Sequence, residues 1–140
     1  MAKVAMIEEF SASAERIWNV IGGFNSLPAW HPAVEHSELE ADGKIRKVTL
    51  GDGTTIFEKL EHHSEESREC SYSIVESPLP VVDYLATLKV SELGEGSQVE
   101  WSGRFEPSGV PESEAVQLVE GIYRAGLDNL KTLLNHQDTD

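Results

Sequence analysis

Alternating apolar and polar residues fill the middle of the chain in short runs. Between residues 34 and 106 these runs are separated by turn-forming residues, which is typical of antiparallel strands that follow one another in sequence. Asp42-Gly43 and residues 94–96 predict tight hairpin turns, and residues 78–80 predict a stiffer loop. The pattern predicts six strands, at residues 34–40, 45–50, 55–63, 69–75, 82–92 and 97–106.

A further strand and a short helix are predicted before this region. Residues 3–10 form a strand-like run, and residues 11–13 then offer hydroxyl groups that can cap the start of a helix. Ile17, Trp18 and Ile21 give that helix one apolar stripe, and the glycines that follow it predict its end. Residues 24–32 contain two prolines and two aromatic residues, which predicts a compact turn or a one-turn helix.

One long helix is predicted at the C-terminal end of the chain. Pro111, Glu112 and Glu114 suit its first turn. Gly121 and Gly126 lie inside it, where each should cost about 1 kcal/mol relative to Ala. We expect close approach of the helix to the sheet, or room for a ligand at Gly126, to offset this cost. The predicted buried face contains Ala115, Leu118, Val119, Ile122, Leu130, Leu133 and Leu134.

These elements predict an α+β fold in which a curved antiparallel sheet of about seven strands packs against the long helix. The length of 140 residues suits one domain with one core. We assign residues 1–136 to this domain and residues 137–140 to a disordered tail. Nothing in the sequence predicts a specific oligomer, and we expect a monomer or a weak homodimer.

The composition narrows the range of partners. The chain has 25 acidic and 11 basic residues, so its formal charge of −14 repels phosphate backbones and anionic membrane surfaces. We therefore expect no nucleic-acid partner. No apolar run is long enough to span a bilayer, and no basic segment precedes an apolar stretch of signal-peptide length, so we expect no membrane insertion and a cytoplasmic location.

Several common kinds of site are absent from the sequence. Cys70 is the single cysteine and the five histidines are scattered, so neither a disulfide nor a metal site is expected. Residues 51–53 carry two glycines but lack the third glycine of a dinucleotide-binding motif, and they lie between strands. No cofactor is therefore expected. The sequence also lacks a P-loop and a nucleophile elbow.

The order of elements and a set of short motifs resemble the Bet v 1-like or START-like (SRPBCC) superfamily, and within it the bacterial polyketide cyclase/dehydrase branch. The resemblance covers nearly the whole chain and implies a helix-grip fold with a cavity between sheet and helix. Its motifs are Ile17-Trp18, residues 28–32 (Pro-Ala-Trp-His-Pro), residues 48–53, Glu58-Lys59-Leu60, Tyr72-Ser73-Ile74, Leu79-Pro80, Tyr84, residues 100–103, Phe105, and residues 121–130 around Gly126.

The resemblance also implies which residues face the cavity. It turns Glu58, Tyr72, Ile74, Tyr84, Leu118, Ile122 and Gly126 inward, and it places Trp30 and His31 near one mouth. Alternation along the strands extends the same faces to Ile56, Leu60, His62, Cys70, Ala86, Leu88, Val99, Trp101 and Phe105. From these, the predicted ligand-binding set is Trp30, Ile56, Glu58, Leu60, His62, Tyr72, Ile74, Tyr84, Leu88, Trp101, Leu118, Ile122 and Gly126.

Plant abscisic acid receptors share this fold and close the cavity with a mobile lid loop and a latch loop. Residues 50–55 resemble the lid and residues 76–80 the latch. The lysine that anchors the hormone in those receptors has no counterpart here, because no lysine occurs between Lys3 and Lys44. The resemblance therefore implies a ligand other than abscisic acid.

The polar members of the predicted wall have alternative explanations. Tyr72 and Tyr84 either orient a ligand or fill the core with their hydroxyls bonded to backbone. His62, near a strand end, is either a polar wall residue or exposed to solvent. Glu58 carries the strongest functional signal, because a buried carboxylate needs a hydrogen-bond partner. We expect that partner to be Tyr72, Tyr84 or a ligand. Trp30 either packs beneath the short helices or borders the cavity.

Three functions remain open at this point. The first is binding of a small lipid-, terpenoid- or polyketide-like molecule in the cavity. The second is catalysis of the cyclase or aromatase type, in which Glu58 with Tyr72 or Tyr84 would move protons. The third is an interaction with a partner protein such as an oxidoreductase, as in the methanol-oxidation members of this branch. A general base and a ligand-orienting carboxylate use the same atoms, so the sequence does not decide among them.

Overall fold

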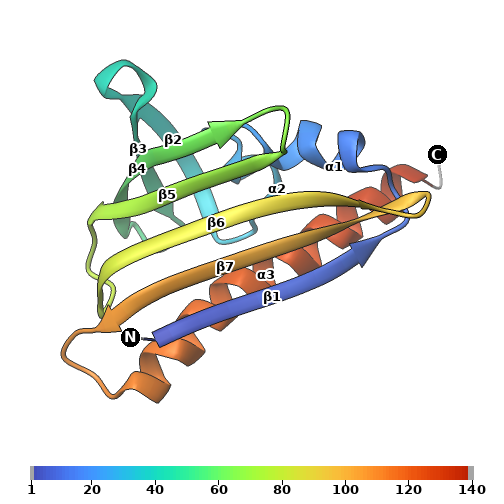
Figure 1. Cartoon of the computed structure of the whole chain (residues 1–140). Coiled ribbons are helices and arrows are strands. Elements are labelled where there is room, and N and C mark those ends of the chain that lie inside the picture. The colour runs from blue at the N-terminus through green and yellow to red at the C-terminus, as the bar shows by residue number, and fades with distance from the viewer. Residues whose placement is uncertain (1, 139–140) are drawn as a thin grey trace.

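The computed structural model describes residues 2–138, with side chains as far as Leu134. Within this range seven strands form one antiparallel sheet in the order β1-β7-β6-β5-β4-β3-β2, so β1 and β2 are its edges (Figure 1). The strands are β1 (Ala2–Phe10), β2 (Val34–Glu40), β3 (Ile45–Leu50), β4 (Thr55–Ser64), β5 (Glu69–Glu76), β6 (Val81–Leu93) and β7 (Gly96–Pro107). Each predicted strand is confirmed to within one residue at either end.

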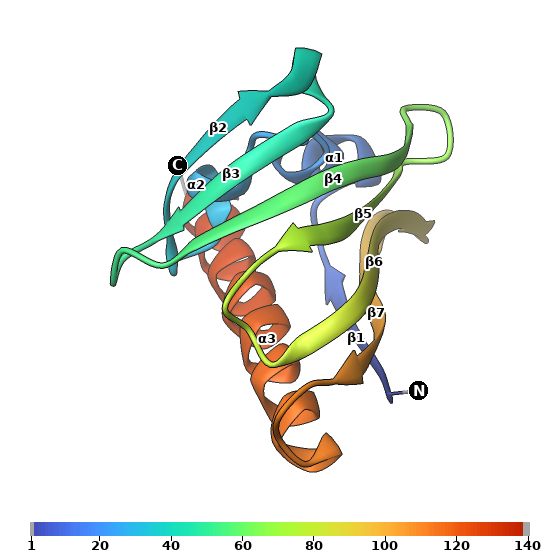
Figure 2. The ribbon, with the colours of Figure 1, turned by 90° about the vertical axis from the view of Figure 1, so that its left-hand side faces the viewer.

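The helices occupy the concave side of the curved sheet, as Figure 2 shows for α3. The long helix α3 spans Glu112–Asp138, and the short helices α1 (Ala14–Ile21) and α2 (Leu27–Trp30) lie between β1 and β2. A 3₁₀ turn, η1 (Ala41–Gly43), joins β2 to β3. The predicted α+β helix-grip architecture is therefore confirmed. Residues 137 and 138 of the predicted tail belong to helix α3. Residues 139 and 140 lie outside the described residues.

Local contacts explain where α1 begins and ends. The Ser13 hydroxyl accepts a hydrogen bond of 3.2 Å from the backbone nitrogen of Arg16, which caps the first turn. Gly22 follows the last turn, and a Cβ there would lie only 2.5 Å from the indole ring of Trp18. The close ring leaves room only for glycine. The chain then turns toward α2 through Phe24, whose ring is buried.

The register of the sheet decides which side chains meet on its inner face. β3 pairs with β4 so that Arg46 lies opposite Glu58 and Val48 lies opposite Ile56. β4 pairs less regularly with β5, because the register shifts between Phe57 and Glu58 and again between Leu60 and His62. An irregularity of this kind adds a residue to one strand and reverses the alternation of faces beyond it.

The buried apolar side chains form one cluster between the sheet and α3. From β7, Val99, Trp101 and Phe105 are at most 2% exposed. They meet Tyr123 and Leu127 of α3, which are fully buried, and the rings of Trp101 and Tyr123 stack with centroids 4.3 Å apart. This packing holds α3 against β7, the strand next to the β1 edge of the sheet.

The two glycines inside α3 have different surroundings. A Cβ at Gly126 would lie 2.8 Å from His31, 2.8 Å from Trp101 and 2.9 Å from Trp30, so the helix approaches these rings as closely as glycine allows. Close packing is thus the reason for Gly126. The prediction of a close approach to the sheet is wrong for Gly121. This residue is exposed, and a Cβ there would meet no atom within 4 Å.

This difference predicts opposite effects for one substitution made at two positions. Gly121→Ala should raise the free energy of unfolding by about 1 kcal/mol, because it adds helix propensity in open space. Gly126→Ala should lower it by about 1–3 kcal/mol, because the added methyl group overpacks three rings. Urea unfolding followed by circular dichroism measures both changes. Stabilisation by Gly126→Ala would show that the rings yield and that the close packing is unimportant.

Candidate functional site

A cavity of about 90 Å³ lies between α3 and the inner face of the sheet. Its wall combines residues from α2, α3 and strands β2 to β7 and from the loops that join them. The wall is mostly apolar. The lining residues are Leu27, His31, Ala33, Val34, Val48, Leu50, Ile56, Glu58, Tyr72, Leu79, Tyr84, Trp101, Val119 and Ile122.

The cavity brings together part of the predicted ligand-binding set. Six predicted residues lie in its wall, namely Ile56, Glu58, Tyr72, Tyr84, Trp101 and Ile122. The other seven, Trp30, Leu60, His62, Ile74, Leu88, Leu118 and Gly126, do not line it. Five of the six are inward-facing strand residues, and Ile122 lies on α3.

The strand residues that miss the cavity do so for local reasons. His62 is exposed, because the register shift after Leu60 breaks the alternation on which its placement depended. Leu60 and Ile74 are only half-buried at the edge of the core. Leu88 is buried opposite Trp101 but does not itself line the cavity.

The helical and aromatic residues that miss the cavity have other roles. Leu118 is 37% exposed on the outer side of α3. Trp30 is buried against Trp101, with ring centroids 5.4 Å apart, and therefore packs behind the cavity wall. Gly126 faces the same rings, as described above. His31 takes the place in the wall that had been predicted for Trp30.

A buried ion pair stands at the polar end of the cavity. The Arg46 Nε donates a hydrogen bond of 2.7 Å to Oε1 of Glu58, and the two residues are 4% and 8% exposed. The arginine was not among the predicted site residues, and it replaces Tyr72 and Tyr84 as the partner expected for Glu58. Two features of the sequence could have identified Arg46. Alternation puts it on the same inward face as Val48, and a hairpin at residues 51–54 puts it opposite Glu58.

The rest of the Arg46 guanidinium is held by neighbouring groups. Its Nη1 donates a short hydrogen bond to the backbone oxygen of Phe24. Its plane lies over the Phe24 ring at 4.5 Å and the Tyr72 ring at 4.8 Å, at distances typical of cation–π contacts. Arg46 therefore ties β3 and β4 to the segment between α1 and α2, and it fixes the direction of the Glu58 carboxylate.

The tyrosines of the site act as hydrogen-bond groups. The Tyr72 hydroxyl accepts a hydrogen bond of 3.1 Å from Nε1 of Trp101 and keeps its own proton for donation. The hydroxyls of Tyr84 and Tyr123 share a short hydrogen bond. Burial raises the pKa of all three phenols above their usual value, so they stay protonated near neutral pH. They can donate protons in hydrogen bonds but are poor bases.

The surroundings of two further buried groups, His31 and Cys70, determine their protonation states. Nε2 of His31 lies 2.8 Å from the backbone oxygen of Ile122, and its Nδ1 accepts a hydrogen bond from the Ala33 nitrogen. This arrangement fixes the neutral tautomer with its proton on Nε2, and burial lowers the pKa of His31. Burial raises the pKa of the Cys70 thiol to about 11, which removes the thiolate needed for nucleophilic chemistry.

The site therefore offers an apolar space whose wall holds one carboxylate acceptor, Glu58, and one hydroxyl donor, Tyr72. Oε2 of Glu58 makes no hydrogen bond within the described residues, whereas Oε1 is taken by Arg46. A ligand hydroxyl or amine can donate to this free oxygen. No three or more His, Cys, Asp or Glu side chains gather to hold a metal ion anywhere in the described chain. None of its helices is long and apolar enough to cross a membrane.

Comparison with solved structures finds several close matches. Protein XoxI from Bacillus cereus shares 42% identity with a TM-score of 0.93, and the alignment covers 95% of each chain. A norcoclaurine synthase point mutant from Thalictrum flavum, solved with a transition-state analogue, shares 27% identity with a TM-score of 0.71, covering 97% of this chain and 96% of that one.

A START superfamily protein from Mycobacterium smegmatis shares the fold, with a TM-score of 0.80 at 15% identity over 96% of this chain and 98% of that one. No curated protein matched the sequence. A family model described as polyketide cyclase/dehydrase and lipid transport matches residues 1–135. Because this match spans nearly the whole chain, the protein belongs to the polyketide cyclase/dehydrase and lipid transport family, as its motifs indicated.

Proposed function

We propose that the protein binds a small, mainly apolar molecule in the cavity, with a hydroxyl or amine group of the ligand on the Glu58 carboxylate. The observation that supports this best is the free Oε2 of Glu58 at the end of an apolar wall. A few oriented polar groups in an apolar pocket are what binding sites use to select a ligand. The family description, which names polyketide chemistry and lipid transport, agrees with an apolar ligand.

The size of the cavity places a condition on this proposal. At about 90 Å³ it is smaller than the cavity of about 150 Å³ that admits benzene, and far below the roughly 300–1,000 Å³ of sites for larger ligands. A polyketide- or terpenoid-sized ligand therefore requires part of the wall to move. The wall must open where it is least tightly packed.

Two loops at the mouth are suited to this movement. Leu50 precedes the β3–β4 loop and Leu79 lies in the β5–β6 loop, and both half-buried side chains line the cavity. They belong to the segments predicted as lid and latch. Gly53 adopts a φ of 90° that side chains rarely tolerate, and nothing lies within 4 Å of its Cβ position. Outward movement of Leu50 and Leu79 would enlarge the cavity without disturbing the ion pair.

Catalysis by Glu58 is the second candidate, because Glu58 lines the cavity and has one carboxylate oxygen that Arg46 does not use. As a base, Glu58 would have to take a proton while its other oxygen remains bonded to Arg46. The Arg46 guanidinium holds Oε1 in a fixed hydrogen bond, so only the second carboxylate oxygen is left to meet a ligand. Tyr72 and Tyr84, with raised pKa values, would supply hydrogen bonds and not base catalysis. The pair therefore favours orientation of a ligand over proton transfer.

A fluorescent probe and a blocked cavity test the proposed binding. 1-Aminoanthracene is apolar, neutral near pH 7, and carries an amine donor, and its emission rises in apolar surroundings. We expect saturable binding to the wild-type protein. Ile122→Trp should weaken binding by about tenfold or more, because the indole fills space that the ligand needs and overpacks the wall.

Val116→Trp provides the matched control. Val116 is also a half-buried apolar residue of α3, but it does not line the cavity, so its substitution should leave the affinity within about twofold. Far-ultraviolet circular dichroism confirms that both variants are folded. Absence of saturable binding, or equal loss in the two variants, would contradict binding in this cavity.

Hydrogen exchange tests the predicted movement of the β3–β4 loop. Residues 51–54 should exchange rapidly in the free protein and gain protection when 1-aminoanthracene binds, because the ligand holds the loop closed over it. The β6–β7 turn at residues 94–95 is remote from the cavity wall and provides an internal control that should not change. Equal protection of residues 51–54 with and without probe would leave this loop as an ordinary hairpin.

A further inference from the structure

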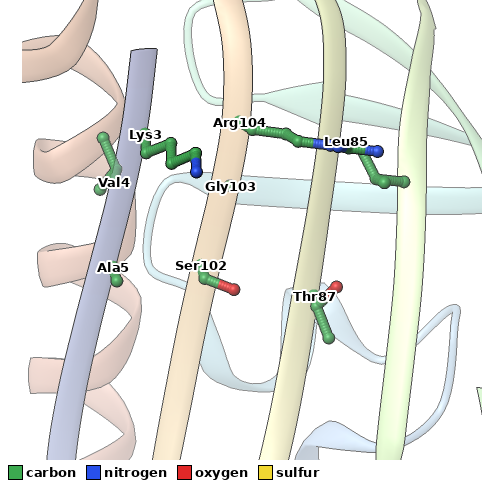
Figure 3. A pocket seen from close by; sticks show the side chains of 8 residues that line it. All are labelled: Lys3, Val4, Ala5, Leu85, Thr87, Ser102, Gly103 and Arg104. Atoms are coloured by element: carbon green, nitrogen blue, oxygen red, sulfur yellow. The ribbon is translucent and has the colours of Figure 1, made fainter. Parts of the chain in front are cut away.

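The outer face of the sheet carries a second concave region, on the side away from α3 (Figure 3). It has a volume of about 260 Å³ and spans three neighbouring strands, β1, β7 and β6. Two rows of side chains cross these strands. The upper row is Lys3, Arg104 and Leu85, and the lower row is Ala5, Ser102 and Thr87, as the strand register places them. We call this region the outer groove.

The upper row places two cationic residues at directly paired positions of neighbouring strands. Lys3 of β1 pairs with Arg104 of β7, and like charges at such positions repel. Neither residue forms an ion pair with a carboxylate in the described part of the chain. This is unusual in a protein with 25 acidic residues.

The next outward-facing row shows the arrangement that stabilises a sheet surface. There Glu100 of β7 lies opposite Lys89 of β6, and the Lys89 amine lies 3.9 Å from a carboxylate oxygen of Glu69 on β5. Charges of opposite sign alternate across these strands. The row at Lys3 and Arg104 has no carboxylate that pairs with its cations. Charge repulsion that the fold leaves uncompensated is common at functional sites.

The lower row makes room below the two cations and adds hydroxyl groups. Ala5 and Ser102 are small, so they leave the groove open between the longer side chains of the upper row. Figure 3 shows the Lys3 and Arg104 side chains extending across the strands above the Ser102 and Thr87 side chains. Thr87 also shares a hydrogen bond of 2.9 Å with Ser71 on β5.

We propose that the outer groove binds a small organic anion through a carboxylate or phosphate group. The Lys3 amine and the Arg104 guanidinium supply the positive charge, and the Ser102 and Thr87 hydroxyls supply further donors. Leu85 and Ala5 offer apolar surface to a short hydrocarbon part of the same molecule. An anion at this position relieves the repulsion between the two cations.

The net charge of −14 does not prevent this binding. At physiological ionic strength charges farther than about 8 Å are largely screened, so the field in the groove depends on nearby charges, of which Lys3 and Arg104 border the groove directly. The nearest outward carboxylates along β7 are Glu100 and Glu106, each two residues from a groove residue. Elsewhere the acidic surface repels small anions and limits competing binding.

The outer groove and the inner cavity are separate sites. Gly103 contributes its backbone to the groove, and on the inner side a Cβ at this residue would lie 2.2 Å from the Tyr123 hydroxyl. The sheet itself therefore divides the groove from the tyrosines, of which Tyr84 lines the cavity. Binding at one site can be tested while the other is empty.

A two-dimensional ¹H–¹⁵N NMR titration of the full chain tests the outer groove. The probes are inorganic phosphate and butyrate, each added at constant ionic strength against chloride. We expect saturable shifts at the amides of Ala5, Ser102 and Thr87 with at least one probe. The double variant Lys3→Gln/Arg104→Gln should weaken that binding by about tenfold or more, because two charge-assisted hydrogen bonds are lost.

The matched control is Lys47→Gln/Lys59→Gln, which removes two cations from the outer face of β3 and β4. Neither lysine lies opposite another cation in the register, and the control should change the affinity by less than about twofold. Equal weakening in both double variants would show a general charge effect and overturn the proposal, as would the absence of saturable shifts for both probes.

A melting experiment supplies a second readout. Phosphate or butyrate should raise the melting temperature of the wild-type protein, relative to chloride, and not that of Lys3→Gln/Arg104→Gln. The same double variant should keep wild-type affinity for 1-aminoanthracene, which shows that it is folded and that its cavity is intact. An equal rise in the melting temperature of both proteins would contradict an anion site at these two residues.

Discussion

A guanidinium and a carboxylate meet 2.7 Å apart in the interior of this protein, and both would be expensive to bury alone. Arg46 and Glu58 satisfy each other across the β3–β4 pair, and the Phe24 carbonyl and two aromatic rings complete the surroundings of the guanidinium. Since the contact joins neighbouring strands to the segment between the short helices, it holds one end of the cavity in a defined shape. The carboxylate oxygen left over gives that end its polarity.

The opposite side of the site depends on close packing. Gly126 lets α3 approach Trp30, His31 and Trp101, and this contact closes the cavity on the side of α2. His31 uses both ring nitrogens on backbone groups, so it holds α3 and the chain after α2 together as a neutral group. One side of the site is therefore closely packed aromatic rings, and one end is the Arg46–Glu58 ion pair. The less tightly packed part lies at Leu50 and the β5–β6 loop.

Most of the fold was predictable because apolar residues alternate regularly along the strands and turn residues separate them. The site was predictable only in part. His62 was misplaced because a register shift depends on backbone pairing that alternation does not reveal. Arg46 was missed because a charged residue in a strand is usually exposed, although the hairpin register places it opposite Glu58. Gly121 shows that a glycine in a helix does not by itself indicate a close contact.

The most direct test of this account is a double-mutant cycle on the ion pair, with Arg46→Met, Glu58→Gln and the variant carrying both. Each single substitution should lower the free energy of unfolding by about 3–5 kcal/mol, because it leaves a buried polar group without its partner. The double variant should lose much less than the sum of the two, since removal of both charges also removes their desolvation cost. Additive losses, or single losses close to zero, would contradict the claim that this pair organises the cavity.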